Sequence, residues 1–208
     1  MTLVTRIESL LTPETGRLLE TFFHADSVFA GTTFDHLADN PRDHFTTSDL
    51  IAVSLLDMRF TPRAVRALLE EQSNDLSDQL SQVRSDVDLW AASDHDLAAA
   101  TTLWRTLAAG GALKGVGPTT TSKLLARKRP RLVPIVDSVV RDALALGDDS
   151  WVELRAALQQ RGLPDRIEAL RPAGVKHPVS TLRLLDAAVW MHHSRSRNAK
   201  SARRTVGV

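Results

Sequence analysis

The sequence predicts an all-α protein, and three features of the 208-residue chain support that prediction. Alanine and leucine are abundant, apolar residues recur at intervals of three and four, and glycine and proline fall between the periodic segments. The pattern gives no support for strands. A chain of this length forms one domain, or two small lobes, with a substantial core.

The expected helices follow local start signals. Thr12-Pro13, a cap residue followed by a first-turn proline, separates helices at residues 3–11 and 13–24. Thr46 or Thr47 caps an apolar helix around residues 50–56, and Thr61-Pro62 opens the next. Residues 27–44 are expected to be irregular. Later helices are expected around residues 76–83, from Ser93 to Gly110-Gly111, over 118–127, after Asp137, and around 154–158, 167–170 and 182–190.

The most informative segment is residues 113–121, Leu-Lys-Gly-Val-Gly-Pro-Thr-Thr-Thr. Its two glycines tolerate positive φ and leave room for close approach, and the proline suits the first position of a helix. Free amides and the positive end of the helix dipole favour a bound anion, here a phosphate. The segment therefore predicts a helix-hairpin-helix at about residues 98–127, which would hold the backbone of double-stranded DNA.

The candidate DNA contacts belong to this hairpin and its second helix: Gly115, Val116, Gly117, Thr119, Thr120, Thr121, Lys123 and Arg127. The threonine hydroxyls are expected to donate to phosphate oxygens beside the glycine amides. Alternatively, they only cap their own helix. Lys123 and Arg127 are four residues apart, so they share one helical face and are expected to contact the DNA backbone.

Charge is segregated along a chain whose net charge is only +1. Asp137 is the only acid between Lys114 and Arg141, where the basic residues are Lys114, Lys123, Arg127, Lys128, Arg129, Arg131 and Arg141. Residues 70–96 are strongly acidic by contrast. A local basic field holds a polyanion even when the net charge is small. The alternative is that residues 127–131 form only a solvated helix end.

Residues 113–140 resemble the helix-hairpin-helix DNA glycosylase superfamily, whose pattern is Leu-Pro-Gly-Val-Gly, a helix, a short apolar segment and Val-Asp. The resemblance implies two helical lobes around a cleft, with Asp137 as the catalytic carboxylate. Bifunctional members carry a lysine where this chain has Thr119, so the resemblance implies a monofunctional enzyme or one that has lost base excision. Lys114 also replaces the usual proline. Asp137 is equally well placed to cap the following helix and do nothing more.

The whole chain also resembles an uncharacterised actinobacterial family, a domain of unknown function. The shared segment is Lys-Leu-Leu-Ala-Arg-Lys-Arg-Pro-Arg-Leu-Val-Pro, at residues 123–134. This second resemblance implies no function.

Composition excludes several kinds of site. The chain has no cysteine, which excludes disulfides, thiolate zinc sites and iron–sulfur clusters. Its seven histidines show no metal-ligand spacing, so neither metal nor cofactor is expected. The four tryptophans are expected in the core. No apolar run is long enough to span a membrane, and a cytoplasmic protein is the default expectation.

We therefore expect one helical domain over residues 1–193 and a disordered basic arm over residues 194–208. The preferred function is DNA binding, with excision of a modified base by a monofunctional glycosylase as its activity. Two alternatives stay open. One is a non-catalytic DNA-binding accessory or regulatory protein, and the other is a helical protein–protein module.

Overall fold

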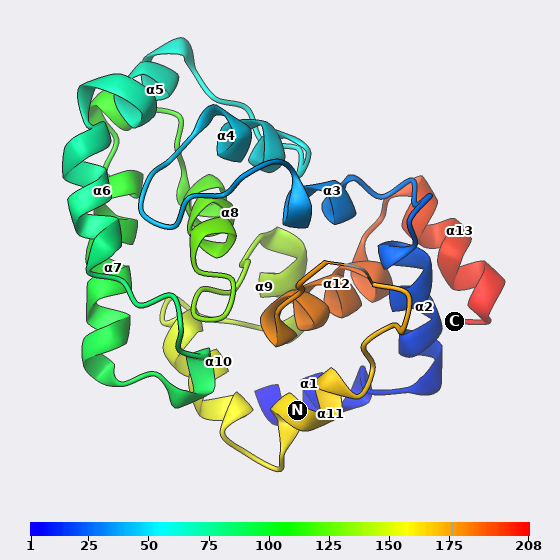
Figure 1. The fold of residues 1–208 in the computed structure, drawn as a ribbon. Coiled ribbons are helices and arrows are strands. Elements are labelled where there is room, and N and C mark those ends of the chain that lie inside the picture. The colour runs from blue at the N-terminus through cyan, green and yellow to red at the C-terminus, as the bar shows by residue number, and fades with distance from the viewer. Residues whose placement is uncertain (176) are drawn as a thin grey trace.

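A computed structural model of the chain describes residues 1–175 and 177–208. The protein is all-helical, as the sequence predicts, and these residues form 13 α-helices and no strand (Figure 1). Within the same residues, no helix combines the length and apolar character that a membrane crossing requires. The helices are α1 (Leu3–Ser9), α2 (Pro13–Phe23), α3 (Ala30–His36), α4 (Thr47–Ser54), α5 (Pro62–Arg66), α6 (Ser73–Ser81), α7 (Asp94–Ala108), α8 (Pro118–Lys128), α9 (Ser138–Leu144), α10 (Ser150–Leu158), α11 (Leu163–Glu168), α12 (Thr181–His193) and α13 (Arg197–Val206).

Most helices begin where the sequence places a cap. Thr12 precedes α2 and its side chain accepts a hydrogen bond from a first-turn amide. Thr46 and Ser93 each form a reciprocal capping box with an aspartate three residues later, Asp49 and Asp96. Such boxes satisfy backbone groups that a helix start would otherwise leave unpaired. These local signals explain why the helix starts are predictable.

Two helices form the centre of the molecule (Figure 1). Helix α12 packs against α2, α9, α11 and α13, and helix α8 packs against α4 and α7. Residues 120–129 and 182–189 are buried without interruption. Helices that are buried on all sides carry their polar side chains into the interior, where each needs a partner.

Residues 27–44, expected to be irregular, contain the short helix α3. No side chain caps its first turn. It is held instead by tertiary contacts, because the Thr32 hydroxyl donates to the Phe22 carbonyl at 2.7 Å and Phe34 is buried in the core. Helices of this length depend on packing rather than on intrinsic propensity, so the local pattern did not reveal it.

Residues 194–208, expected to be a disordered arm, form helix α13 instead. Ser196 caps the helix, and Ala199 and Ala202 are buried against α2 and α12. The Arg203 guanidinium donates to the carbonyls of Met191 and Ser194 at the end of α12. The small apolar stripe and this one arginine dock the helix, while its other cations stay exposed.

The basic end of α8 is buried, which differs from both sequence-based alternatives for residues 127–131. Arg127 and Lys128 pair with the fully buried carboxylate of Asp49, with an Arg127 Nε to Asp49 Oδ1 distance of 3.1 Å. Arg129 binds Asp43 at 2.6 Å and several backbone carbonyls. Only Arg131 of this basic group lies exposed, paired with Asp88. The segment binds α8 to the rest of the protein.

Replacing Asp49 by asparagine tests the weight of this buried cluster. The substitution leaves two buried cations without a counter-charge, so we expect the free energy of unfolding to fall by about 3–5 kcal/mol. Urea denaturation measures the change. Asp86→Asn, which breaks an exposed pair with Arg84, is the control and should leave the urea midpoint unchanged. Equal midpoints for Asp49→Asn and the wild type would contradict the structural role of Asp49.

Candidate functional site

Helices α7 and α8 are joined by residues 109–117, where the sequence predicts the hairpin. A 3₁₀ turn at Gly111–Leu113 leads into Lys114, and Gly115 has φ of +102°, which requires glycine. A Cβ atom on Gly115 would also lie 2.8 Å from Thr61 Cγ2. The Thr61 hydroxyl donates to the Lys114 carbonyl at 3.0 Å, so the hairpin packs against the start of α5.

The tip of the hairpin is open. A Cβ atom on Gly117 would meet nothing within 4 Å. Gly117 is also the N-cap residue of α8, and within the described part of the chain no side chain caps this helix. The first amides of α8 are therefore available to an external acceptor, which is the property expected of a phosphate-binding hairpin.

The structure divides the predicted contact residues into two groups. Gly115 is exposed, and Gly117 and Thr119 are partly exposed. The remaining predicted residues are buried, namely Val116, Thr120, Thr121, Lys123 and Arg127. The expectation that Lys123 and Arg127 form a DNA-facing stripe is therefore wrong in geometry. Arg127 is committed to Asp49, and Lys123 points into a pocket.

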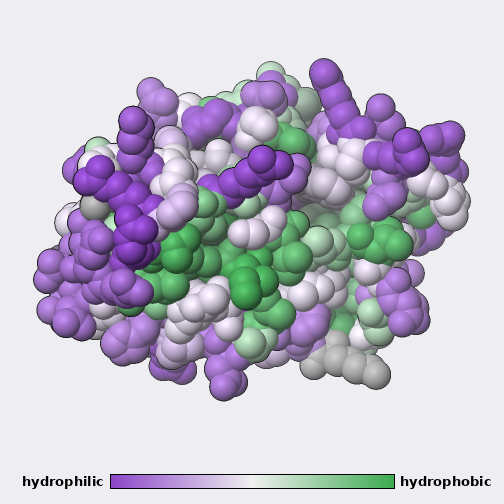
Figure 2. Space-filling view, turned by 90° about the horizontal axis from the view of Figure 1, so that it is seen from above, coloured by the Kyte–Doolittle hydropathy of each residue, from purple (hydrophilic) through white to green (hydrophobic). Residues whose placement is uncertain are grey.

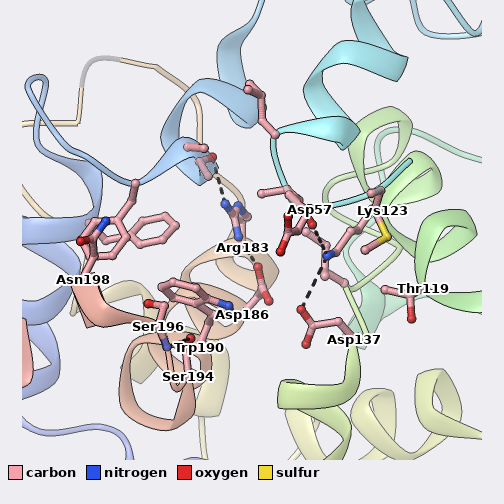
Figure 3. A pocket seen from close by; sticks show the side chains of 18 of the residues that line it. Asp57, Thr119, Lys123, Asp137, Arg183, Asp186, Trp190, Ser194, Ser196 and Asn198 are labelled. Atoms are coloured by element: carbon pink, nitrogen blue, oxygen red, sulfur yellow. Dashed lines mark hydrogen bonds and ion pairs between the residues drawn. The ribbon is translucent and has the colours of Figure 1, made fainter. Parts of the chain in front are cut away.

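That pocket has a volume of about 600 Å³ and lies where five parts of the chain meet (Figure 3). Its wall combines aromatic, aliphatic and charged side chains. The lining residues are Phe22, Val28, Phe29, Ala30, Gly31, Leu55, Leu56, Asp57, Met58, Thr119, Lys123, Ile135, Asp137, Ser138, Arg183, Asp186, Trp190, Ser194, Ser196 and Asn198. Thr119 and Asp137 are thus brought to the same cavity.

Asp137 has two roles in this geometry. Its Oδ1 accepts a hydrogen bond from the Val140 amide at 3.0 Å, so the residue is the N-cap of α9. Its Oδ2 lies 3.7 Å from Lys123 Nζ, and the side chain borders the pocket with 14% of its surface exposed. Capping fixes the carboxylate and leaves one oxygen directed at the cavity.

Lys123 faces Asp137 from the second turn of α8. Its Nζ donates to the Leu56 carbonyl at 2.9 Å. Burial lowers the pKa of the Lys123 ammonium, while the negative charge of Asp137 acts in the opposite direction. The two groups therefore form a partly desolvated ion pair on one side of the pocket.

A second group of charges lies across the pocket on α12. Arg183 binds Asp35 through Nε, Asp186 through Nη1 and the Gly31 carbonyl through Nη2. A Cβ atom on Gly31 would lie 2.7 Å from Nη2, so only glycine admits the guanidinium here. Burial raises the pKa of Asp186 to about 6, the charge of Arg183 opposes that shift, and the charge of Asp137 adds to it.

Three aromatic rings form another wall. Phe22 and Phe29 are stacked with their centroids 5.3 Å apart, and Trp190 meets Phe29 edge-on at 5.8 Å. The sequence pattern assigned Trp190 to the core, and it packs there while also lining the pocket. An aromatic wall beside fixed charges suits a ligand with a planar ring.

The rim of the pocket is apolar on one side. Val28 is 73% exposed and Leu55 is 38% exposed, and both line the pocket. Ile51, on the preceding turn of α4, is exposed as well. The face seen in Figure 2 shows a broad apolar area bordered by hydrophilic side chains. The pocket therefore opens next to an exposed apolar surface.

Sequence reasoning missed Arg183 and Asp186. Both belong to α12, whose sequence Leu-Arg-Leu-Leu-Asp-Ala-Ala-Val is otherwise apolar. An arginine and an aspartate three residues apart on one face of a buried helix are the signal that was available. Among the described residues, no three histidine, aspartate or glutamate side chains are grouped to hold a metal ion.

The chain belongs to a family of unknown function, DUF6308, whose model matches residues 15–193. The match bears out the expected whole-chain resemblance to a domain of unknown function. It includes Lys123, Asp137 and Asp186, and it ends where α12 ends. No curated protein and no solved structure matched the chain.

The titration of Asp186 gives a prediction about stability. Its pKa is raised from 3.8 to about 6 in the folded protein, so between these pH values the folded state holds a proton that the unfolded state has lost. The free energy of unfolding should therefore fall as the pH rises through this range, by on the order of 3 kcal/mol. Urea unfolding of the wild type and of Asp186→Asn across the range isolates this contribution, since the variant lacks it. A difference between the two proteins that does not change with pH would contradict the assignment.

Proposed function

We propose that the chain is a helix-hairpin-helix DNA-binding protein that excises a base, with Asp137 as the catalytic carboxylate. One observation carries the proposal: a single helix, α8, joins the open hairpin to the pocket. Thr119, two residues after Gly117, lines the cavity, and Lys123 faces Asp137 one turn later (Figure 3). A phosphate bound at the hairpin would hold its nucleotide beside this pocket.

The pocket has the properties that base excision needs. The glycosidic bond is inaccessible inside a duplex, so the nucleotide must leave the stack and enter a site lined by aromatic and polar groups. The ring wall of Phe22, Phe29 and Trp190 suits the base. Asp137 would stabilise the positive charge that develops on the sugar as the base departs, in a site where few waters screen it. Lys123, 3.7 Å from this carboxylate, would be its counter-ion.

The proposed enzyme is monofunctional. Bifunctional members of the glycosylase superfamily carry a lysine at the position of Thr119. A threonine hydroxyl cannot form the imine that such a lysine forms. Lys123 is one turn further along α8, and its Nζ is bound to the Leu56 carbonyl and near Asp137. We propose that it serves as a counter-ion and not as a nucleophile.

Because Lys123 and Arg127 are buried, the DNA-binding surface that we propose consists of other cations, which are exposed. Lys114 is exposed at the hairpin, and Arg197, Lys200 and Arg204 are exposed on α13. Helices α8 and α13 begin on opposite sides of the pocket, where Thr119 and Ser196 are labelled in Figure 3. Exposed cations before α8 and along α13 would hold the backbone of double-stranded DNA on either side of an extruded nucleotide.

Two other functions each have an observation in their favour. Asp137 caps α9, which is sufficient reason for its presence in a non-catalytic DNA-binding accessory protein. The exposed apolar side chains Val28, Ile51 and Leu55 favour a helical protein–protein module. The two experiments below separate these functions from base excision.

The first experiment is an abasic-site assay on duplexes with uracil, hypoxanthine, oxidised guanine, N7-methylguanine or a mismatch. We expect an abasic product with an intact strand, and a rate at least about 100-fold lower for Asp137→Asn. Asparagine also caps helices, so the fold should persist. Asp142→Asn, an exposed change on the same helix, is the control and should retain the wild-type rate. Binding without product would favour the accessory protein, and strand cleavage would show that the enzyme is bifunctional.

The second experiment measures DNA affinity against salt concentration. Each phosphate contact contributes close to one unit to the slope of log affinity against log salt, so Lys114→Ala should reduce the slope by about 1 and Lys200→Ala with Arg204→Ala by about 2. Arg161→Ala with Arg166→Ala is the matched control, because α11 lies at the other end of the molecule (Figure 1). An unchanged slope in all variants would reject this DNA surface, and no DNA binding would favour the protein–protein module.

A further inference from the structure

The pocket contains a second carboxylate, Asp186, that the resemblance to glycosylases does not assign. Its Oδ2 is bound by Arg183 Nη1. Among the residues that the structure describes, no donor binds the other oxygen, and the side chain lines the pocket (Figure 3). Asp186 and Trp190 are four residues apart on α12, so they share one face of that helix. A base lying against Trp190 would have its edge within reach of this carboxyl group.

We propose that Asp186 is the acid that protonates the departing base, and that the substrate is a nucleotide with an uncharged base. This inference rests on the proposed function. An uncharged base leaves as an anion unless a proton reaches one of its ring atoms or exocyclic groups, whereas an already cationic base needs no proton. A pocket with an acid beside its aromatic wall therefore suits an uncharged base.

Asp186 and Asp137 have different roles in the proposed reaction. As the bond between the sugar carbon and the base nitrogen breaks, its electron pair goes to the base and the proton of Asp186 is transferred to the base. The ionised Asp137 stabilises the sugar cation. Water then adds to that carbon and gives its proton to Asp137. The products are the neutral base and an abasic sugar, and the proton on Asp137 returns through solvent to restore Asp186.

Burial and the surrounding charges explain why Asp186 can hold a proton. Arg183 is shared between Asp186 and Asp35, so one guanidinium faces two carboxylates. Asp137 adds a further negative charge from the start of α9, and Lys123 faces Asp137 from α8 at 3.7 Å. Asp137 therefore has a positive partner of its own, whereas Asp186 shares its partner with Asp35. Two carboxyl groups whose environments differ in this way are suited to opposite roles.

Asp35 provides a matched control on the same guanidinium. It binds Arg183 as Asp186 does, but it lines only a neighbouring cavity of about 230 Å³, which Asp186 also borders, and not the pocket of Asp137. Removing either carboxylate deprives Arg183 of one partner. Only the loss of Asp186 removes an acid from the pocket, so a comparison of the two variants separates catalysis from support of Arg183.

The experiment measures single-turnover release of hypoxanthine and uracil, and of N7-methylguanine as the cationic base, against pH. Variants are Asp186→Asn and Asp35→Asn, with folding checked by circular dichroism. For the wild type, release of the uncharged bases should slow above the pKa of Asp186, about 6. Asp186→Asn should lower that release by about 10² to 10⁴-fold and abolish the pH dependence, with little effect on N7-methylguanine. Asp35→Asn should keep the dependence and move it to lower pH, because Arg183 then acts on Asp186 alone.

Three results would overturn the proposal. Equal slowing of charged and uncharged bases by Asp186→Asn would make the residue a structural partner of Arg183. A pH profile unchanged by the variant would do the same, and this test holds even when N7-methylguanine is not a substrate. No release of any base by the wild type would reject base excision itself, and the acid role with it.

Discussion

The buried carboxylate of Asp49 connects the start of α4 with the end of α8, and the position of the candidate site depends on this connection. One carboxylate caps its own helix and neutralises Arg127 and Lys128, two cations with almost no exposure to solvent. Buried ion pairs contribute little net stability compared with an apolar core, but a missing partner is costly. We infer that the pair fixes orientation. With one end of α8 anchored, the hairpin at its other end and the Lys123 side chain between them have defined directions.

The candidate site also contains buried charged side chains that hold one another in place, but there the carboxylates outnumber the cations. Around Asp49, two cations share one carboxylate. On the wall of the pocket, the cations Lys123 and Arg183 lie among the carboxylates Asp57, Asp137 and Asp186, and Arg183 also binds Asp35 outside the pocket. Burial and the negative charge of Asp137 raise the pKa of Asp186, so a proton is favoured on that carboxyl group. A glycine at position 31 makes the arrangement sterically possible, because a larger residue would displace the guanidinium.

The features that could be predicted from the sequence are those encoded by residues close together in the chain. Caps such as Ser93, and the hairpin at Gly115, are encoded within a few residues, and these were predicted. The direction of Arg127 was not, because its partner Asp49 is 78 positions away and no local pattern reports such a pairing. Helices α3 and α13 were missed for a related reason, since tertiary contacts hold them in place. Asp137 was identified from the resemblance of residues 113–140 to the glycosylase pattern, whereas Asp186 lies outside that pattern and reaches the same pocket because α12 packs against α9.

The wall of the pocket is drawn from segments that are far apart along the chain, from Phe22 on α2 to Asn198 on α13. Closing such long loops costs entropy before any contact compensates, so structures rich in distant contacts form slowly and late. A nascent chain that has not yet released α12 from the ribosome contains the hairpin residues, Phe22 and Phe29, but lacks Trp190, Arg183 and Asp186. The complete cavity is therefore absent from partly synthesised or locally unfolded molecules and is a property of the finished fold.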